Sequence, residues 1–280
     1  QENMKIIAHV LLKNEENFVW YSIMSVINYV DRIIIYDTGS DDKTINIIKK
    51  INDKKIILRE IKSDKFYEDK LRQQMLDETT SDWFIVLDAD EIWWDDSIKL
   101  VTDTIQKDGE KLESIVVPTI NMVGDMFHAQ EREAGRYNLA GRIGHYATRA
   151  INRKIIGLHG QGEHGVFMWA DENETKIEDR DQKKIKYLDA PYIHTTHLKR
   201  SDKLEGEKAV YKRAKKLKYE IGIETSKDFF YPEVFFRERP EFIKSPWERM
   251  STVYKLKSAV VTPLKKFRRR YLMKGVPHGY

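Results

Sequence analysis

Four short apolar runs lie between residues 4 and 88, and segments with helical spacing separate them. The runs span residues 4–12, 31–37, 54–61 and 82–88, and each predicts a strand, the first two of them buried. Helices are expected between them, after residue 14 and over residues 45–51 and 70–80. This alternation favours an α/β fold with a mostly parallel sheet, helices on both of its faces and right-handed crossovers.

Acidic residues at the ends of two runs are the first candidates for function. In open parallel sheets, ligands bind beyond the carboxyl ends of the strands. Asp37 closes the second run, and Asp88 closes the fourth. Asp37 precedes a turn in which Gly39 can adopt a positive φ. Its carboxylate could accept hydrogen bonds from a base or a ribose, or the segment could be a plain strand–turn–helix junction.

The stretch "IVLDADEIWW" (85–94) places Asp88, Asp90 and Glu91 close together. These carboxylates repel one another, so the cluster requires a positive group among them. Asp88 and Asp90 point to the same side of an extended strand end, and Asp90 is expected to be exposed. Because the chain has no cysteine, the paired oxygens suit a hard divalent cation, Mn²⁺ or Mg²⁺, that also binds substrate phosphates. The alternative is a solvated acidic turn.

Three stretches in this order carry a family resemblance: "LLKNEE", "VDRIIIYDTGSDDKTINII" and "LRQQMLDETTSDWFIVLDADE". Together they resemble the inverting family 2 glycosyltransferases, which have the GT-A fold. The usual sequence motifs of that family are a K-N-E-E loop, a D-x-G-S-x-D-x-T turn, an A-R-N helix and a D-A-D-E strand end. The resemblance covers about residues 5 to 95, and Gln73 stands where the family has Asn.

The resemblance implies a GT-A type, Rossmann-like sheet and a role for each matching residue. Asp37 would read the base of the donor, and Asp88 would lie near the ribose and the metal. Asp90 would be a direct metal ligand. Lys13 and Arg72 would stabilise the phosphates of a nucleoside-diphosphate sugar. The cation would neutralise the leaving diphosphate as the glycosidic bond breaks.

The second half of the chain is expected to supply the acceptor side. An inverting transfer needs a general base within reach of the acceptor hydroxyl. Glu163, in a Gly- and His-rich segment, is the candidate, and Glu91 is the alternative. Either His194 or His197 could complete the metal shell and favour Mn²⁺, or both could be structural histidines.

Two arginines of the second half have less definite expectations. Arg149 is expected to be structural or to face the acceptor, and Arg200 could be a phosphate clamp.

The basic character of the chain is local. The net charge is +4, but residues 261–280 contain six Lys or Arg residues and no acid, so nucleic-acid binding is not expected. Residues 253–260 predict an amphipathic helix that ends before Pro263. Cations next to apolar residues suit an anionic membrane surface, and the acceptor would then be lipid-linked or otherwise membrane-proximal. The alternative is a basic helix that docks on the protein's own acidic surface.

Neither a signal peptide nor an 18-residue apolar run is apparent, so we expect a cytoplasmic location. This expectation includes peripheral attachment to the inner face of the membrane. We expect a donor-binding part (4–125), an acceptor and metal-completing part of the same domain (126–200) and a basic helical C-terminal region (201–280), with a helical stripe that begins at Leu204. The predicted function is metal-dependent sugar transfer to a hydroxyl of a glycan or lipid-linked acceptor. The alternatives are a sugar nucleotidyltransferase and a noncatalytic sugar- or nucleotide-binding module.

Overall fold

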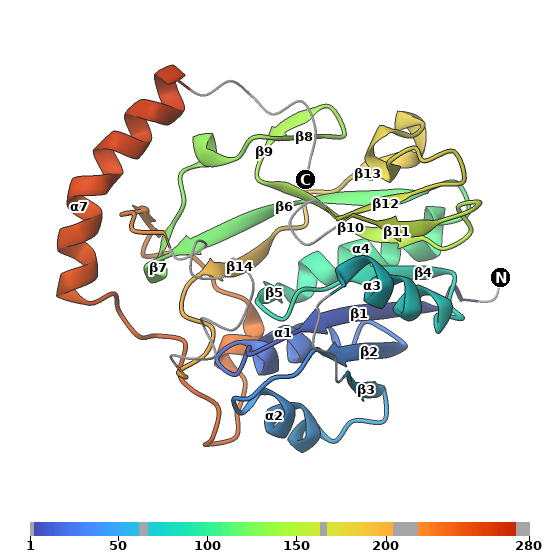
Figure 1. Cartoon of the computed structure of the whole chain (residues 1–280), viewed down its shortest axis with the longest axis horizontal. Coiled ribbons are helices and arrows are strands. Elements are labelled where there is room, and N and C mark those ends of the chain that lie inside the picture. Colours follow the sequence, from blue (N-terminus) through green and yellow to red (C-terminus); the bar gives the residue numbers. More distant parts are fainter. Residues whose placement is uncertain (1–2, 62–66, 163–166, 204–217, 273–280) are drawn as a thin grey trace.

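The computed structural model describes residues 3–61, 67–162, 167–203 and 218–272 of the chain. These residues form an eleven-stranded mixed sheet with helices on both faces (Figure 1). The strands of the sheet are β1 (Ile6–Leu12), β2 (Arg32–Asp37), β3 (Ile56–Glu60), β4 (Trp83–Val86), β5 (Glu91–Trp93), β6 (Ser114–Val123), β7 (Asp125–Ala129), β10 (Tyr146–Asn152), β13 (Ile185–Tyr187), β14 (Tyr192–His197) and β15 (Ile223–Glu224).

Two small hairpins and the helices complete the described structure. The hairpins pair β8 (Tyr137–Leu139) with β9 (Arg142–Gly144), and β11 (His159–Gln161) with β12 (Met168–Ala170). The α-helices are α1 (Val19–Val26), α2 (Thr44–Ile51), α3 (Glu68–Asp77), α4 (Asp95–Asp108) and α7 (Thr252–Phe267). The short helical turns are η1 (Arg132–Ala134), η2 (Ile177–Asp179), η3 (Gln182–Lys184), η4 (Glu233–Phe236) and the π-helical turn η5 (Arg268–Leu272).

The N-terminal part of the sheet is parallel, in the order β3–β2–β1–β4. Beyond β4 the sheet continues with β10, which runs antiparallel to both β4 and β6. The predicted α/β fold and its four strands are therefore confirmed, although β3, at the end of the sheet, is only partly buried. The carboxyl ends of β1, β2 and β4 meet at one edge of the sheet, where a ligand is expected in such folds.

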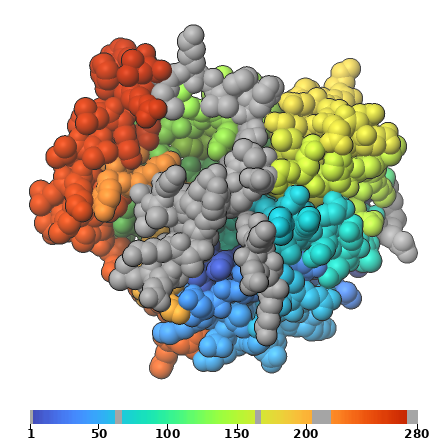
Figure 2. Space-filling model, in the orientation of Figure 1, coloured from blue at the N-terminus to red at the C-terminus, as the bar shows by residue number. Residues whose placement is uncertain are grey.

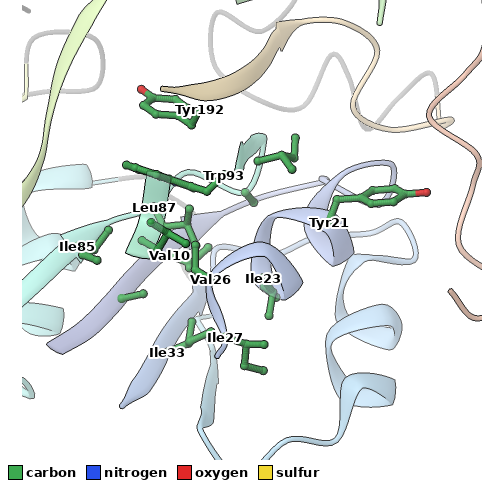
Figure 3. Close-up of a cluster of buried hydrophobic side chains, with 14 of the residues drawn as sticks. Val10, Tyr21, Ile23, Val26, Ile27, Ile33, Ile85, Leu87, Trp93 and Tyr192 are labelled. Carbon is green, nitrogen blue, oxygen red and sulfur yellow. The ribbon is translucent and has the colours of Figure 1, made fainter. Parts of the chain in front are cut away.

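The two faces of β1 pack against different helices because successive strand residues point to opposite sides. Val10 belongs to the large core that also contains Val26 of α1 (Figure 3). Residues of α2 and α4 complete this core. Ile7 points to the other face and packs in a second cluster with Met75 of α3. Each fully buried aliphatic side chain contributes about 1.5–3 kcal/mol, so this alternation fixes the register of the strand.

The C-terminal helix differs from its prediction. It was expected to end before Pro263, but α7 continues through this proline to Phe267. Proline removes the hydrogen bond to the carbonyl four residues earlier, that of Ala259. Both residues are exposed, so water can satisfy this carbonyl. On the inner side, the hydroxyl of Thr262 accepts a hydrogen bond from the backbone N–H of Ile221 (2.8 Å), which holds the helix in place.

Some expectations are not settled by this fold. The helical stripe that begins at Leu204 and the candidate base Glu163 lie outside the described residues. The division of the chain at residues 125 and 200 stays a prediction, and strands from both sides of residue 125 share one sheet. Within the described ranges, no helix is both long enough and apolar enough to span a bilayer.

His9, in the middle of β1, is a buried titratable group. Its Nε2 lies 2.6 Å from the hydroxyl of Thr79, and its ring stacks on Phe84 with centroids 4.6 Å apart. Burial, together with the charge of Arg72, lowers the pKa of His9 to about 3. The folded protein therefore keeps this imidazole neutral, whereas the unfolded chain protonates it below about pH 6.5.

This difference predicts a loss of stability in acid. The unfolded state binds the extra proton, so the contribution of His9 is present above about pH 6.5 and falls as the pH drops toward 3, by about 1.4 kcal/mol per unit. His9→Gln removes the titration. The difference in unfolding free energy between the wild type and His9→Gln should therefore shrink by about 2 kcal/mol from about pH 7.5 to about pH 5. Urea unfolding at both pH values measures it, and an unchanged difference would contradict a neutral His9.

Candidate functional site

The first loop and the second turn interlock at the carboxyl edge of the sheet. The backbone N–H of Asn14 donates to Ser40 Oγ (2.8 Å), and Asn14 Oδ1 accepts from the N–H of Asp41 (2.9 Å). The N–H of Glu15 donates to Thr44 Oγ1 (2.8 Å). Side chains of both motifs thus satisfy backbone groups of the other, which fixes the positions of the residues that follow β1 and β2.

Asp37 lies at the end of β2, paired in register with Leu12 of β1. Its Oδ1 accepts hydrogen bonds from the N–H groups of Gly39 (2.9 Å) and Ser40 (2.8 Å), and Gly39 has the predicted positive φ of 95°. Its Oδ2 is buried and has no hydrogen-bond partner among the described residues. A buried carboxylate oxygen without a donor is costly, so this atom favours a ligand that supplies one.

The three carboxylates after β4 differ in exposure. The Asp88 side chain is 32% exposed, whereas Asp90 and Glu91 are buried. The expectation that Asp90 is exposed was wrong, because β14 covers the turn. The N–H and the hydroxyl of Thr195 both donate to the Asp90 carbonyl, at 2.8 and 3.1 Å.

Two arginines neutralise Asp88 and Glu91. Arg72 Nη2 lies 3.5 Å from Asp88 Oδ1, and Arg149 Nη2 lies 3.3 Å from Asp88 Oδ2. Arg149 also pairs with Glu91. Burial raises the pKa of Asp88, but Arg149 and Arg72 outweigh burial and hold this pKa below its ordinary value. Burial raises the pKa of Glu91 to about 7, although Arg149 opposes the shift.

A third arginine binds Asp90. Arg200 Nη1 lies 2.6 Å from Asp90 Oδ2 and 3.0 Å from Glu15 Oε1. From the sequence, Arg200 could be a phosphate clamp and Arg149 a structural or acceptor-facing residue; in the structure both form ion pairs with the acidic turn. Sequence reasoning missed this because the partners are far apart in the chain and no local pattern marks the pairs.

Asp88, Asp90 and His194 form a group that could hold a cation. One ligand atom from each lies within 4.8 Å of the others, and His194 Nε2 is 3.4 Å from Asp90 Oδ2. The antiparallel register of β14 on β5 pairs His194 with Glu91, which brings the imidazole to the acidic turn. Two carboxylates and an imidazole suit Mn²⁺, and the carboxylates also suit Mg²⁺, so the residues fit a divalent cation.

The second histidine lies elsewhere. His197 Nε2 is 3.2 Å from Lys218 Nζ, and among the described residues His197 does not join Asp88 and Asp90 in a ligand group. The geometry therefore distinguishes two histidines that the sequence left equivalent.

Arg72 has a further donor at this edge. Its Nε donates to Glu68 Oε1 (2.8 Å), one helical turn earlier, and its guanidinium lies over the ring of Phe167 (5.2 Å). Its Nη1 is buried, and within the described ranges it has no hydrogen-bond partner. Lys13 directly follows β1 and is half-buried. An unsatisfied guanidinium donor beside a candidate cation site suits an anionic ligand such as phosphate.

Comparison with known proteins identifies the family. The model of the family described as "Glycosyl transferase family 2" matches residues 8–170. No curated protein sequence matches the chain significantly.

Solved structures with similar folds include S. aureus TarS 1–349 (TM-score 0.47, 14% identity, 69% of this chain and 61% of that one). A longer S. aureus TarS structure has a TM-score of 0.46 and 16% identity, with 69% of this chain and 37% of that one covered. The chain thus spans less than two thirds of either TarS chain.

Another similar structure is glucosyl-3-phosphoglycerate synthase from Mycobacterium tuberculosis in complex with Mn²⁺, uridine diphosphate and glucosyl-3-phosphoglycerate. It has a TM-score of 0.48 and 14% identity, and covers 76% of this chain and 77% of that one. The family model spans more than half of the 280 residues, and it includes the interlocked loops and the acidic turn. The protein therefore belongs to glycosyl transferase family 2.

Proposed function

We propose that the protein moves a sugar from a nucleoside-diphosphate sugar to a hydroxyl acceptor, with inversion. The observation that carries this proposal is the Asp88–Asp90–His194 group at the sheet edge. Asp37 and Arg72 end at the same edge, each with a buried polar atom that lacks a partner among the described residues. Together these groups offer a cation site, an acceptor for a base and a donor for a phosphate, which are the needs of a nucleotide-sugar donor.

Each residue would have a distinct role in the transfer. Asp37 would accept a hydrogen bond from the base, and Arg72 and Lys13 would bind the diphosphate. Asp88, Asp90 and His194 would hold Mn²⁺ or Mg²⁺, which supplies Lewis-acid stabilisation of the leaving diphosphate when bound. The acceptor oxygen attacks the anomeric carbon as the bond from that carbon to the diphosphate oxygen breaks, and the hydroxyl proton passes to a base.

The base is proposed to be Glu163 or Glu91. Glu163 lies outside the described residues. Glu91 is buried and paired with Arg149, so it would need to release this pair before it could contact an acceptor hydroxyl. The burial of Glu91 and its pairing with Arg149 therefore count against it as the base, which favours Glu163. Glu91 would instead orient Arg149 beside Asp88.

Two other functions make different predictions. A sugar nucleotidyltransferase would use a Gly-rich basic loop after its first strand, and residues 13–18 here contain no glycine. A noncatalytic sugar- or nucleotide-binding module would bind the nucleotide without breaking the sugar bond. Slow release of free sugar from UDP- or GDP-sugars in the presence of Mn²⁺ distinguishes transfer chemistry from either alternative.

The first prediction from this proposed function concerns the nucleotide. UDP or GDP with Mn²⁺ should raise the melting temperature, because a ligand of the folded state stabilises it. Asp37→Asn replaces an accepting carboxylate, so it should weaken nucleotide affinity by about 10–100-fold, on the scale of one charge-assisted hydrogen bond. Asp41→Asn is the matched control, since Asp41 is exposed in the same turn and pairs with Lys203. Calorimetric titration measures both variants, and equal affinities would exclude Asp37 from base binding.

The second prediction distinguishes the histidines. His194→Gln should weaken Mn²⁺ binding by at least about 10–100-fold, because it removes a group that lies with both aspartates. His197→Gln should have a small effect, since His197 lies beside Lys218. Mn²⁺ titration followed by electron paramagnetic resonance gives both affinities. A larger loss in His197→Gln would reverse the assignment.

We further propose that the acceptor is lipid-linked or membrane-proximal, because α7 carries an exposed apolar stripe. Figure 2 shows α7 (red) at the edge of the molecule. Large apolar side chains recur every three or four residues along α7 and the following turn η5, and each is more than half exposed: Val253, Leu256, Val260, Leu264, Phe267 and Tyr271. Stripes of this size mark interaction surfaces.

The charges of this helix favour an anionic lipid surface as its partner. Residues 252–272 contain seven Lys or Arg residues and no acid. Like charges disfavour self-association through this stripe, whereas each cation near an anionic bilayer contributes about 1 kcal/mol. Part of the basic character serves the protein itself, because Arg269 pairs with Glu220 and with Glu131. The sequence placed the membrane contact in residues 261–280, but the apolar stripe begins earlier, at Val253.

The third prediction tests this surface. The protein should sediment with anionic vesicles and not with neutral vesicles. Replacing Leu256, Val260 and Leu264 by Ser should reduce this binding at least about tenfold, because the apolar area that enters the interface is lost. Ile156→Ser is the matched control, as Ile156 is 70% exposed in the turn that follows β10, away from α7 in the sequence. Binding that ignores lipid charge, or that survives the triple substitution, would contradict membrane attachment through α7.

A further inference from the structure

A chain of polar groups extends from His194 away from the candidate cation site. Asn121 Oδ1 lies 3.2 Å from His194 Nδ1, and Asn121 Nδ2 lies 2.9 Å from His145 Nδ1. His145 Nε2 lies 3.1 Å from the backbone carbonyl of Glu131. The parallel register of β14 on β6 pairs His194 with Asn121, which explains why the first two groups meet.

The carbonyl at the far end fixes the direction of every hydrogen bond in this chain. A carbonyl can only accept, so His145 Nε2 must carry the proton and donate to Glu131. Nδ1 of the neutral His145 then has a lone pair, and only the NH₂ group of Asn121 can satisfy it. The amide oxygen of Asn121 is therefore turned toward His194 and accepts from Nδ1–H.

His145 must be neutral for this reasoning to hold. It is half-buried between β9 and β10. Burial lowers its pKa below the ordinary value for histidine; the hydrogen bond to Glu131 opposes this shift, and the nearby charges of Lys218 and Arg269 add to it. At neutral pH and above, His145 is therefore uncharged and accepts at Nδ1.

We propose that Asn121 and His145 are positioning residues that hold His194 in the Nδ1–H tautomer, with its Nε2 lone pair directed at the cation site. This inference rests on the proposed metal site. In the opposite tautomer, Nε2–H would donate to Asp90 Oδ2, 3.4 Å away, and could not bind a cation. Groups of this kind, which orient a metal-binding imidazole, affect metal affinity by about 10–100-fold.

The tautomers can be measured without metal. Two-bond ¹H–¹⁵N spectra of ¹⁵N-histidine-labelled, metal-free protein at about pH 8, above the ordinary histidine pKa, report which ring nitrogen carries the proton. We expect Nδ1–H for His194 and Nε2–H for His145, with assignments from His194→Gln and His145→Gln spectra. Nε2–H for His194, or Nδ1–H for His145, in the wild type would overturn the proposal even if no variant folded.

Two substitutions at Asn121 separate the effects on the two histidines. Asn121→Asp keeps an acceptor for His194 but cannot donate to His145, so His194 should stay Nδ1–H while His145 gains a proton on Nδ1. Asn121→Leu removes both contacts, and His194 should lose its fixed Nδ1–H state. The control is His128→Leu. His128 is half-buried on β7 and pairs with Asp125, and neither residue belongs to the series of polar groups between His194 and Glu131.

Metal affinity provides the second readout. Mn²⁺ titration should show a loss of about 10–100-fold for Asn121→Leu, near-wild-type affinity for Asn121→Asp and no change for His128→Leu. Equal losses in both Asn121 variants would show that packing, and not the tautomer, is what Asn121 provides. If the wild type showed the expected tautomers but bound no Mn²⁺, the proposed function would fail while the tautomer assignment stood.

Discussion

The structure depends on how the three carboxylates after β4 are neutralised. Each has an arginine partner: Arg72 and Arg149 for Asp88, Arg149 for Glu91, and Arg200 for Asp90. Buried charges of one sign are tolerated only when opposite charges lie among them. Counting the glutamates that share these arginines, the ion pairs of the described residues join five carboxylates to three guanidinium groups. A divalent cation held by Asp88, Asp90 and His194 would add further positive charge to this network.

These ion pairs explain why the acidic turn depends on both halves of the fold. The acids follow β4 in the parallel part of the sheet, whereas Arg149 comes from β10 and Arg200 follows β14. The imidazole of His194 arrives on the same strand, β14, and its outer partners extend to Glu131, whose side chain pairs with Arg269. Contacts thus run from the acidic turn to the element that follows α7. The proposed donor side and the proposed membrane side therefore belong to one connected structure.

Local patterns predicted the parallel sheet and the positions of Asp37 and Asp88, because the periodicity of a short segment decides strand ends. The sequence could not predict the partners of the acids. Arg149 meets Glu91 across 58 residues and Arg200 meets Asp90 across 110, and only the order of strands in the sheet brings them together. The helix end was wrong for a similar reason, since tertiary contacts and solvent offset the cost of a proline inside α7.

The most direct test of the central claim is anomalous diffraction from crystals soaked with Mn²⁺ and UDP, recorded near the manganese absorption edge. If Asp88, Asp90 and His194 hold a divalent cation, one strong peak should lie between the Asp88 and Asp90 carboxylates, and His194 Nε2 should point toward it. The guanidinium of Arg200 should remain on Asp90. A peak at another position, or an acidic turn neutralised by arginines alone with UDP bound, would contradict the claim.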